Sequence, residues 1–294
     1  MNDDEFLAER FEAHRTHLRA VAYRMLGSLS EADDAVQDAW LRASRAGTDG
    51  VENLGGWLTT IVARVSLDVL RSRATRREDP LDVHVPDPVI SSAAGLDPEH
   101  EVLLADSVGL ALLVVLDTLP PAERLAFVLH DMFAVPFDDI APIVDRSPTA
   151  TRQLASRARR RVQGATPAPD ADLSRQREVV DAFLTAARGG DFDALVAVLD
   201  PDVLMRADTG TADGRVSRLI RGARQVAGQA VTFAAYAPFA RAALINGSPG
   251  IVTAPDGQLF SVMGFTITAG KVTEINLLAD PTRLATLPWE PLGD

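Results

Sequence analysis

The spacing of hydrophobic and polar positions predicts a helical first half of the chain. Over residues 3–26 the apolar residues form one helical stripe, which Gly27 ends: Phe11, Leu18, Val21, Ala22 and Met25. A second helix is expected to follow Ser30, which would cap an acidic first turn. A third is expected from Trp57 to about Arg73, after a glycine-rich loop. We therefore predict three consecutive helices.

The middle of the chain has the pattern of a helix-turn-helix. Four prolines between Glu78 and Pro98 predict an extended linker, because the residue before a proline avoids helix. Helices are expected at about 99–118, in "PPAERLAFVLHDMF" and around 138–144, although Pro142 should kink the last of these or delay its start. A basic helix then begins with Ser147 as N-cap and Pro148 in the first helical position. Apolar-faced helices followed by a tight turn and a basic helix are typical of this DNA-binding motif.

The basic helix divides into an apolar and a polar face. Leu154, Ala158 and Val162 form the expected inner stripe. Arginines near its C-terminal end would suit the helix dipole, but Arg152 in the first turn opposes it, and a polyanion there would compensate. Gln and Arg can read base edges, and the other arginines can pair with phosphates. The candidate DNA-binding residues of this helix are Thr149, Arg152, Gln153, Ser156, Arg157 and Arg160.

Hydrophobic alternation becomes strand-like in the last third of the chain. A short linker, "GATPAPDAD", precedes two expected helices at about 174–188 and 191–199. Four alternating segments follow, "ARAALIN", "GIVTA", "QLFSVMGFTIT" and "KVTEINLLA", separated by turns at 246–247, 256–257 and 269–270. Helices followed by an antiparallel meander predict an α+β domain with a curved sheet.

The net charge of the chain is not that of a simple DNA-binding protein. The formal net charge is −12, and both residues 1–165 and residues 166–294 carry an excess of acids. Such a chain is not expected to bind duplex DNA by electrostatics alone. The arginines nevertheless cluster at 64–77 and 148–162. We infer two contacts with nucleic acid, made while another partner covers the acidic remainder.

Several classes of protein are not favoured by the sequence. No run of about 18 apolar residues indicates a membrane span, and the acidic N-terminus lacks the layout of a signal peptide. The absence of cysteine fits a reducing cytoplasm, where we expect the protein to act. No nucleotide-binding glycine loop, metal-spaced set of ligands or nucleophile triad occurs, so no cofactor, metal or catalytic residue is predicted.

Residues 1–165 resemble a sigma factor of the extracytoplasmic-function group. "FEAHRTHLRAVAYRMLGSLSEADDAVQDAWLRASR" is similar to that family's first helical region, and "NLGGWLTTIVARVSLDVLRSRATRR" to the helix that opens and reads the −10 promoter element. The helix-turn-helix stretch resembles the module that reads the −35 element. Two shorter stretches, "VHVPDPVI" and "ADPTRLATL", resemble motifs of a subgroup with a fused C-terminal SnoaL-like domain of the NTF2-like cone fold.

The resemblance implies a division of the chain into functional segments. Residues 1–78 would be region 2, 79–98 a Pro-rich linker, 99–164 region 4, 165–173 a second linker and 174–294 the SnoaL-like regulatory domain. The fold class implied is two all-α sigma domains followed by an α+β cone. The partners implied are core RNA polymerase and promoter DNA, with a possible small ligand in the C-terminal domain.

The resemblance also assigns residues outside the basic helix. The −10 element would be contacted by Asn53, Arg64, Arg71, Arg73, Arg76 and Arg77. Trp57 could stack on a base, but packing in the core is the favoured interpretation. The acidic helix would dock on polymerase through Asp33, Asp34, Gln37, Asp38 and Arg42, although a solvated face is the ordinary meaning of such a pattern. The regulatory linker would comprise Val85, Pro86, Asp87 and Pro88.

Two other functions remain open from the sequence. One is a repressor or activator that uses the helix-turn-helix alone, with the cone domain sensing a ligand. The other is an isomerase or cyclase of the cone class. Because no histidine follows His130, its base would be a carboxylate such as Asp202 or Asp208, with a pKa raised by an apolar cup.

Overall fold

The computed structural model describes residues 3–76, 83–92, 109–165, 169–211 and 216–289, and the chain divides into two compact units. The N-terminal unit comprises residues 1–79 and 115–165. The C-terminal unit comprises residues 80–114 and 166–294. The described residues of the central segment, 83–92 and 109–114, therefore belong with the later part of the chain.

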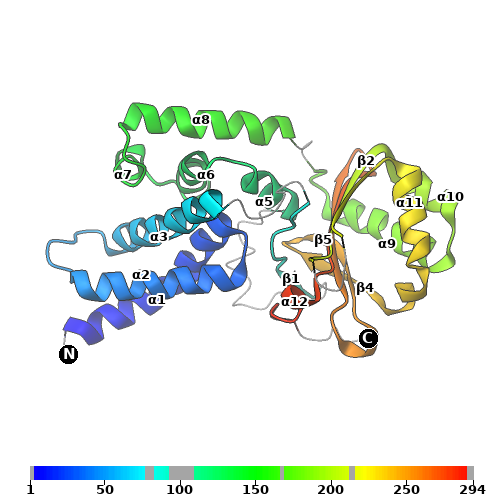
Figure 1. The fold of residues 1–294 in the computed structure, drawn as a ribbon, viewed down its shortest axis with the longest axis horizontal. Helices are drawn as coiled ribbons and strands as arrows, with labels where there is room; N and C mark the ends of the chain where they lie inside the picture. Colours follow the sequence, from blue (N-terminus) through cyan, green and yellow to red (C-terminus); the bar gives the residue numbers. More distant parts are fainter. Residues whose placement is uncertain (1–2, 77–82, 93–108, 166–168, 212–215, 290–294) are drawn as a thin grey trace. The chain divides into compact units, whose positions relative to one another are not determined.

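Three long helices, α1 (Asp3–Leu26), α2 (Leu29–Ala46) and α3 (Leu54–Arg76), form a bundle in the N-terminal unit (Figure 1). The predicted stripe of α1 is buried, and Gly27 ends the helix with a left-handed φ of 70°. The predicted cap of α2 is wrong by two residues. Ser28 is the N-cap, and Ser30 lies inside the first turn, where its hydroxyl is 3.2 Å from that of Ser28.

The second module of this unit is the predicted helix-turn-helix. It consists of α6 (Pro121–Phe127), a π-helical turn η1 (Val128–Met132), α7 (Phe137–Ile140) and α8 (Pro148–Ala165). Helix α5 (Leu110–Asp117) precedes it, and only its last residues, 115–117, belong to this unit. The helix expected over 138–144 is shorter than predicted and ends at Ile140, because Pro142 cannot continue it. The expected helical start at 99 lies outside the described residues. Ser147 caps α8 as predicted, accepting from the Ala150 amide at 3.2 Å.

A buried arginine joins the two modules of the N-terminal unit. Arg124 of α6, only 2% exposed, donates from Nε and Nη2 to the Arg24 carbonyl of α1 at 3.2 and 3.1 Å. Its Nη1 pairs with Asp117. The guanidinium of Arg24 lies over the Phe133 ring, 5.0 Å from its centroid. The C-terminal end of α1 is therefore fixed to the helix-turn-helix through charge-assisted hydrogen bonds.

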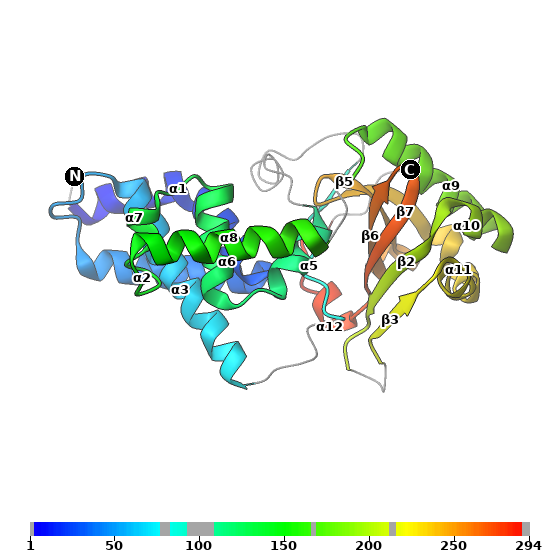
Figure 2. The ribbon, with the colours of Figure 1, turned by 90° about the horizontal axis from the view of Figure 1, so that it is seen from above.

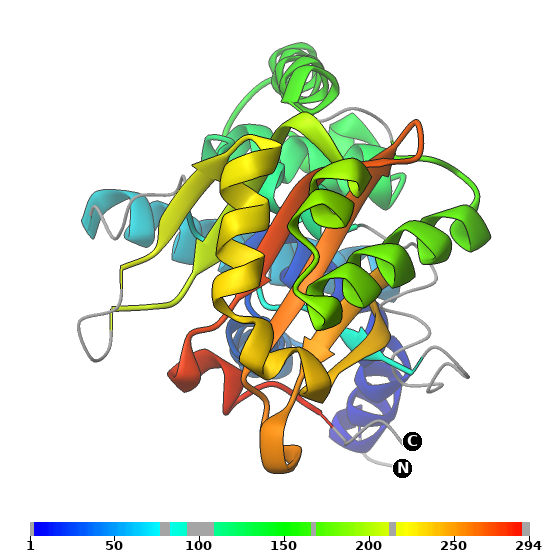
Figure 3. The ribbon, with the colours of Figure 1, turned by 90° about the vertical axis from the view of Figure 1, so that its right-hand side faces the viewer.

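The C-terminal unit is a seven-stranded mixed sheet with helices on one face (Figure 3). The sheet has the order β1-β4-β5-β6-β7-β2-β3. Its strands are β1 (Ile90–Ser91), β2 (Leu199–Asp208), β3 (Arg218–Arg221), β4 (Ala240–Ile245), β5 (Ser248–Thr253), β6 (Ser261–Thr268) and β7 (Lys271–Leu278). Its helical segments are α9 (Leu173–Gly189), α10 (Phe192–Val198), α11 (Ala223–Thr232), α12 (Pro281–Leu284) and the 3-10 turns η3 (Ala234–Phe239) and η4 (Pro255–Gly257).

The predicted antiparallel meander corresponds to β4–β7, but the sheet contains further strands that were not predicted. Strand β2 pairs in parallel with β7, and β3 extends the sheet beyond β2. Neither strand, nor α11, was predicted. The apolar residues of β2 and α11 pack with Phe183 and Ile275 into one core, in which β2 is part of the sheet and α11 packs against it.

The turn between β6 and β7 depends on a side chain from the second predicted linker. Ala269 has a left-handed φ of 51°, a conformation that disfavours residues with a Cβ atom. Both carboxylate oxygens of Asp170 accept from this turn, at 2.9 Å from the Ala269 amide and 2.9 Å from the Gly270 amide. These two hydrogen bonds lower the pKa of Asp170. The end of the linker is therefore attached to the sheet.

The buried arginine gives a stability prediction. Arg124→Leu leaves the Asp117 carboxylate without its cation and the Arg24 carbonyl without its donors. We expect the free energy of unfolding to fall by about 3 kcal/mol, measured by urea denaturation. In the control Arg159→Ala, which breaks the half-exposed pair with Asp131, the loss should stay below about 1 kcal/mol. Equal losses would contradict a special role for Arg124.

Candidate functional site

The exposed face of α8 carries the predicted DNA-reading residues. Figure 2 shows α8 running beside α6, onto which it packs through Thr151, Ala155 and Ala158. That buried stripe begins at Thr151, whereas Leu154 and Val162 are only partly buried, because the helix is rotated slightly from the predicted orientation. The polar residues predicted for the outer face are exposed: Thr149, Arg152, Gln153, Ser156, Arg157 and Arg160.

Three arginines of α8 pair with acidic side chains of their own unit. Arg157 and Arg161 both pair with the buried carboxylate of Glu123, at 2.7 and 3.0 Å. Arg159 pairs with Asp131 at 2.6 Å. The prediction that Arg159 and Arg161 serve phosphates or the helix dipole overlooked these acids, which precede their arginines by 28 and 38 residues in sequence. Arg157, a predicted DNA contact, also attaches α8 to α6.

The N-terminal end of α8 is the part least used for internal contacts. Arg152 lies over the ring of Phe137, 5.2 Å from its centroid, which orients the guanidinium without neutralising it. Gln153 and Thr149 have no side-chain hydrogen bond among the described residues. Exposed donors therefore gather at a helix N-terminus, whose dipole favours an anion.

The predicted −10 residues fall into two groups. Arg64 and Arg71 are exposed on α3 and have no ion pair within the described part of the chain. Asn53 caps α3, since its Oδ1 accepts from the Gly56 amide at 3.0 Å. Arg73 donates to the Leu26 carbonyl at 3.1 Å and pairs with Glu31, so it ties α3 to the end of α1.

Other residues of this candidate surface are less well defined. The side chain of Arg76 and the whole of Arg77 lie outside the described residues. Trp57 is partly buried near the start of α3, which agrees with the favoured packing role.

All five residues predicted to dock on polymerase are exposed on α2. Asp33 is bound by Arg19 of α1 at 2.6 and 3.1 Å, and Arg42 lies 3.6 Å from Asp68 of α3. The other three residues have no internal ion pair or hydrogen bond among those described: Asp34, Gln37 and Asp38. Leu41, one turn further along this stripe, is 41% exposed. The sequence prediction missed it, although a leucine on an otherwise polar face was a detectable signal.

The predicted linker residues, Val85, Pro86, Asp87 and Pro88, are all buried in the C-terminal unit. Just after them, Val89 exchanges backbone and side-chain hydrogen bonds with Asn246 at 2.8 and 3.1 Å, and β1 pairs with β4. The described part of the predicted extended linker, residues 83–92, therefore packs within the C-terminal unit, and its residues 90 and 91 form the edge strand of the sheet.

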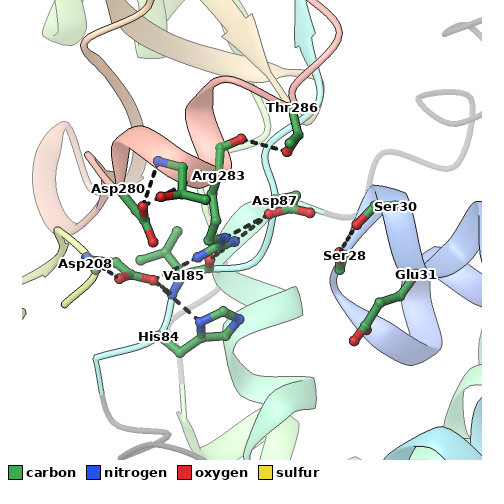
Figure 4. Close-up of polar contacts among 12 residues, drawn as sticks. Ser28, Ser30, Glu31, His84, Val85, Asp87, Asp208, Asp280, Arg283 and Thr286 are labelled. Carbon is green, nitrogen blue, oxygen red and sulfur yellow. Dashed lines mark hydrogen bonds and ion pairs between the residues drawn. The ribbon is translucent and has the colours of Figure 1, made fainter. Parts of the chain in front are cut away.

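A polar cluster holds this edge in place, and we call it the linker latch: His84, Val85, Asp87, Asp208 and Arg283 (Figure 4). Arg283 donates to the Val85 carbonyl at 2.7 Å, to Asp87 at 2.5 and 3.1 Å and to Asp208 at 2.8 Å. The Val85 amide donates to Asp208 at 3.0 Å, and His84 Nδ1 lies 3.4 Å from the same carboxylate. One guanidinium thus serves two buried carboxylates and a carbonyl.

Arg283 is positioned by the short helix α12. Asp280 caps it, accepting from the Thr282 and Arg283 amides at 2.9 and 3.5 Å, and Pro281 occupies its first position. Gly210 allows Asp280 to approach the end of β2, because a Cβ atom there would lie 2.5 Å from the Asp280 carboxylate. The sequence signal for this arrangement was the stretch "ADPTRLATL", in which Asp-Pro marks a helix start.

The contacts of Asp208 in the latch make this residue unsuitable as a general base. Burial opposes its ionisation, but the hydrogen bonds from His84 and the Val85 amide and the charge of Arg283 outweigh burial and lower its pKa to about 2. A base needs the opposite shift. Asp202, the other candidate, is exposed on β2.

No group of side chains in the described segments could hold a metal ion. Within the same segments, every helix is too short or too polar to span a bilayer.

Comparison with known proteins follows the division seen in the structure. Residues 10–76 match the profile of sigma-70 region 2, and residues 109–162 match that of sigma-70 region 4. The chain is 35% identical over 291 residues to the probable ECF RNA polymerase sigma factor SigI of Mycobacterium tuberculosis, covering 99% of each chain. It is 39% identical over 292 residues to the ECF RNA polymerase sigma factor SigJ of the same organism, covering 95% of this chain and 93% of that one.

A solved structure extends the similarity to the C-terminal unit. The crystal structure of Mycobacterium tuberculosis SigJ matches 96% of this chain and 100% of that chain, with a TM-score of 0.75 and 33% identity. The predicted fold class, two all-α sigma domains followed by an α+β cone-shaped NTF2-like domain, is confirmed. The chain belongs to the family of extracytoplasmic-function RNA polymerase sigma factors.

Proposed function

We propose that this protein recruits core RNA polymerase to promoters through three surfaces and is regulated through its linker latch. It would act in the cytoplasm, with the polymerase, and without catalysing a reaction itself. The observation that carries the proposal is the set of exposed side chains at the N-terminal end of α8, within a chain of this family. Helix α8 would read the −35 element in the major groove, and α3 would contact the −10 element.

The polymerase surface would be the stripe of α2 that lacks internal partners. Asp34, Gln37 and Asp38 flank the exposed Leu41, so a half-exposed apolar side chain lies within a polar face. Interfaces commonly combine a central apolar contact with charges that set register and association rate. Asp33 and Arg42 would contribute mainly by holding α2 on the bundle.

In the N-terminal unit the two helical modules are in direct contact. The −10 and −35 elements lie about 25 base pairs apart, which is about 85 Å at about 3.4 Å per base pair. Modules joined by the Arg124–Arg24 contact lie too close together to reach both elements at once. The modules must therefore separate, and the chain between them must be free to extend. Because the latch holds the middle of that chain, we infer that it favours the resting state.

The α8 surface gives a prediction of promoter specificity. Gln153→Ala should reduce the preference for the cognate −35 base pair by about fivefold to 150-fold, because a good base contact contributes about 1–3 kcal/mol of discrimination. The measurement is transcription by core polymerase from promoters that differ at single −35 positions. Gln163→Ala, an exposed glutamine near the end of the same helix, is the control. Unchanged discrimination in Gln153→Ala would contradict this role.

The α2 surface gives a prediction of polymerase binding. Asp38→Lys should slow association with core polymerase severalfold at low salt, and the difference from wild type should shrink as salt screens the charge. Glu9→Lys, which makes the same charge change at an exposed position of α1, should have little effect. The proposed function itself would fail if the wild type bound duplex promoter tightly alone and ignored core polymerase.

The latch gives a prediction of regulation. Arg283→Met removes every hydrogen bond that the guanidinium makes and should raise promoter-specific transcription severalfold, because the linker is released. The control is Arg177→Met, at an exposed arginine of α9. Output equal to or below that of the wild type, in a variant that binds polymerase normally, would contradict the inferred direction.

Acid unfolding checks that the variant has broken the latch. Since the folded pKa of Asp208 is lowered to about 2 from an ordinary 3.8, its ionised form stabilises the fold above about pH 4, and this stability is lost as pH falls toward 2. The full contribution is about 2 kcal/mol. The stability difference between wild type and Arg283→Met should therefore narrow between pH 4 and pH 2.

A further inference from the structure

The C-terminal unit contains a cavity that the proposed function does not use. Its volume is about 490 Å³, within the range of small-molecule sites. It lies between the sheet and the helical segments α9, α11 and η3, which supply its walls together with strands β2 to β7. Every lining residue belongs to the C-terminal unit, so the cavity is formed by this unit alone.

Aromatic rings line the cavity at two levels. Phe183 lies in the core, packed edge-on against Phe265 with ring centroids 5.2 Å apart. Tyr236 and Phe260 are stacked with centroids 4.3 Å apart, and Phe233 follows at 6.4 Å from Tyr236. Phe233 is 48% exposed and Tyr236 is 39% exposed. Exposed aromatic side chains around an apolar hollow are typical of a site for a ring-bearing molecule.

A few polar groups also face this hollow without an internal partner. Thr253 of β5 and Ser261 of β6 stand directly opposite each other in the antiparallel register, and both are 7% exposed. Neither hydroxyl has a side-chain hydrogen bond among the described residues. Thr209 also lines the cavity, and its Oγ1 is buried without a hydrogen-bond partner in the described part of the chain. Buried hydroxyls of this kind usually have a partner, which a ligand oxygen or amide would supply.

The charge of the lining has one sign. Arg218 is the one ionisable side chain besides Tyr236 among the described lining residues, and none of them is acidic. It alternates with Ile220 along β3, and both line the cavity, whereas Leu219 and Arg221 do not. Its guanidinium has no acidic partner within the described segments. Such a lining admits an anion or a neutral molecule and disfavours a cation.

We propose that this cavity is a binding site for a ring-bearing apolar molecule with one anionic group. The rings would contact the aromatic and aliphatic walls, and the anionic group would lie at Arg218 near the exposed edge of the sheet. An oxygen substituent on the rings would bond to the Thr253–Ser261 pair. The site does not depend on the proposed function, because no residue of the latch or of the N-terminal unit lines it.

The site nevertheless touches the strand that carries the latch. Ala207 and Thr209 line the cavity on either side of Asp208, whose carboxylate accepts from the Val85 amide. Along this part of β2, successive side chains point to opposite faces of the sheet. The cavity and the latch therefore lie on opposite faces of the same three-residue segment, 207–209.

The test uses full-length protein and two fluorescent probes with the same aromatic rings. The first, 8-anilinonaphthalene-1-sulfonate, carries one anionic group, and the second, N-phenyl-1-naphthylamine, carries none. We expect saturable binding of one molecule of each per chain. Arg218→Gln should weaken binding of the sulfonate about fivefold and leave the neutral probe unchanged. The matched control Arg221→Gln, on the outer side of the same strand, should change neither.

A second pair of variants locates the probe. Ala230→Phe places a phenyl ring in the cavity and should abolish saturable binding of both probes, whereas Ala235→Phe, at an exposed position outside it, should not. Circular dichroism checks that the variants fold. If Ala230→Phe does not fold, the comparison of Arg218→Gln with Arg221→Gln tests the proposal by itself. Unaltered binding in folded Ala230→Phe, or equal effects of Arg218→Gln and Arg221→Gln on the sulfonate, would overturn the proposal.

Discussion

The ion pairs of Arg283 with two buried carboxylates hold the central segment of the chain against the C-terminal unit. Its guanidinium bonds to a carboxylate 196 residues earlier and to another 75 residues earlier, and both carboxylates are buried. A buried acid that loses its cation destabilises the fold, so Arg283 stabilises both Asp87 and Asp208 in their buried positions. The edge strand β1 follows from that constraint. The segment that connects the two helical modules in sequence is thereby part of the C-terminal domain.

Acidic residues have a related role throughout the molecule, as partners for its own arginines. Glu123 binds two arginines of α8, Glu31 binds Arg73, and Glu274 binds Arg206 at 2.5 Å. The net charge of −12 therefore includes many acids that are already paired. The chain as a whole stays acidic, so affinity for DNA alone should be low and a larger partner would have to supply the rest.

The accuracy of the sequence prediction depended on whether an element is defined by local or by distant contacts. The long helices and the start of α8 could be predicted, because periodicity, Ser147 and Pro148 act within a few residues. The meander could be predicted because its turns carry residues suited to a positive φ, such as Asn246.

Features set by distant residues could not be predicted. Strand β2 pairs with the last strand of the sheet, about 70 residues later, and local alternation contains no information about that parallel pairing. The same limit applies to the site residues. Exposure of Gln153 followed from helical spacing, whereas the engagement of Arg157 by Glu123 required the tertiary fold.

The position of β1 in the sheet has a consequence for synthesis of the protein. Residues 90 and 91 leave the ribosome well before their partners Ile245 and Leu244, and Asp87 leaves 196 residues before Arg283. At about 5–20 residues per second this delay is about 10–40 s. Both helical modules are complete before the latch can form. Each newly made chain therefore passes through an interval in which the latch does not yet exist, although the modules that we propose it restrains already do.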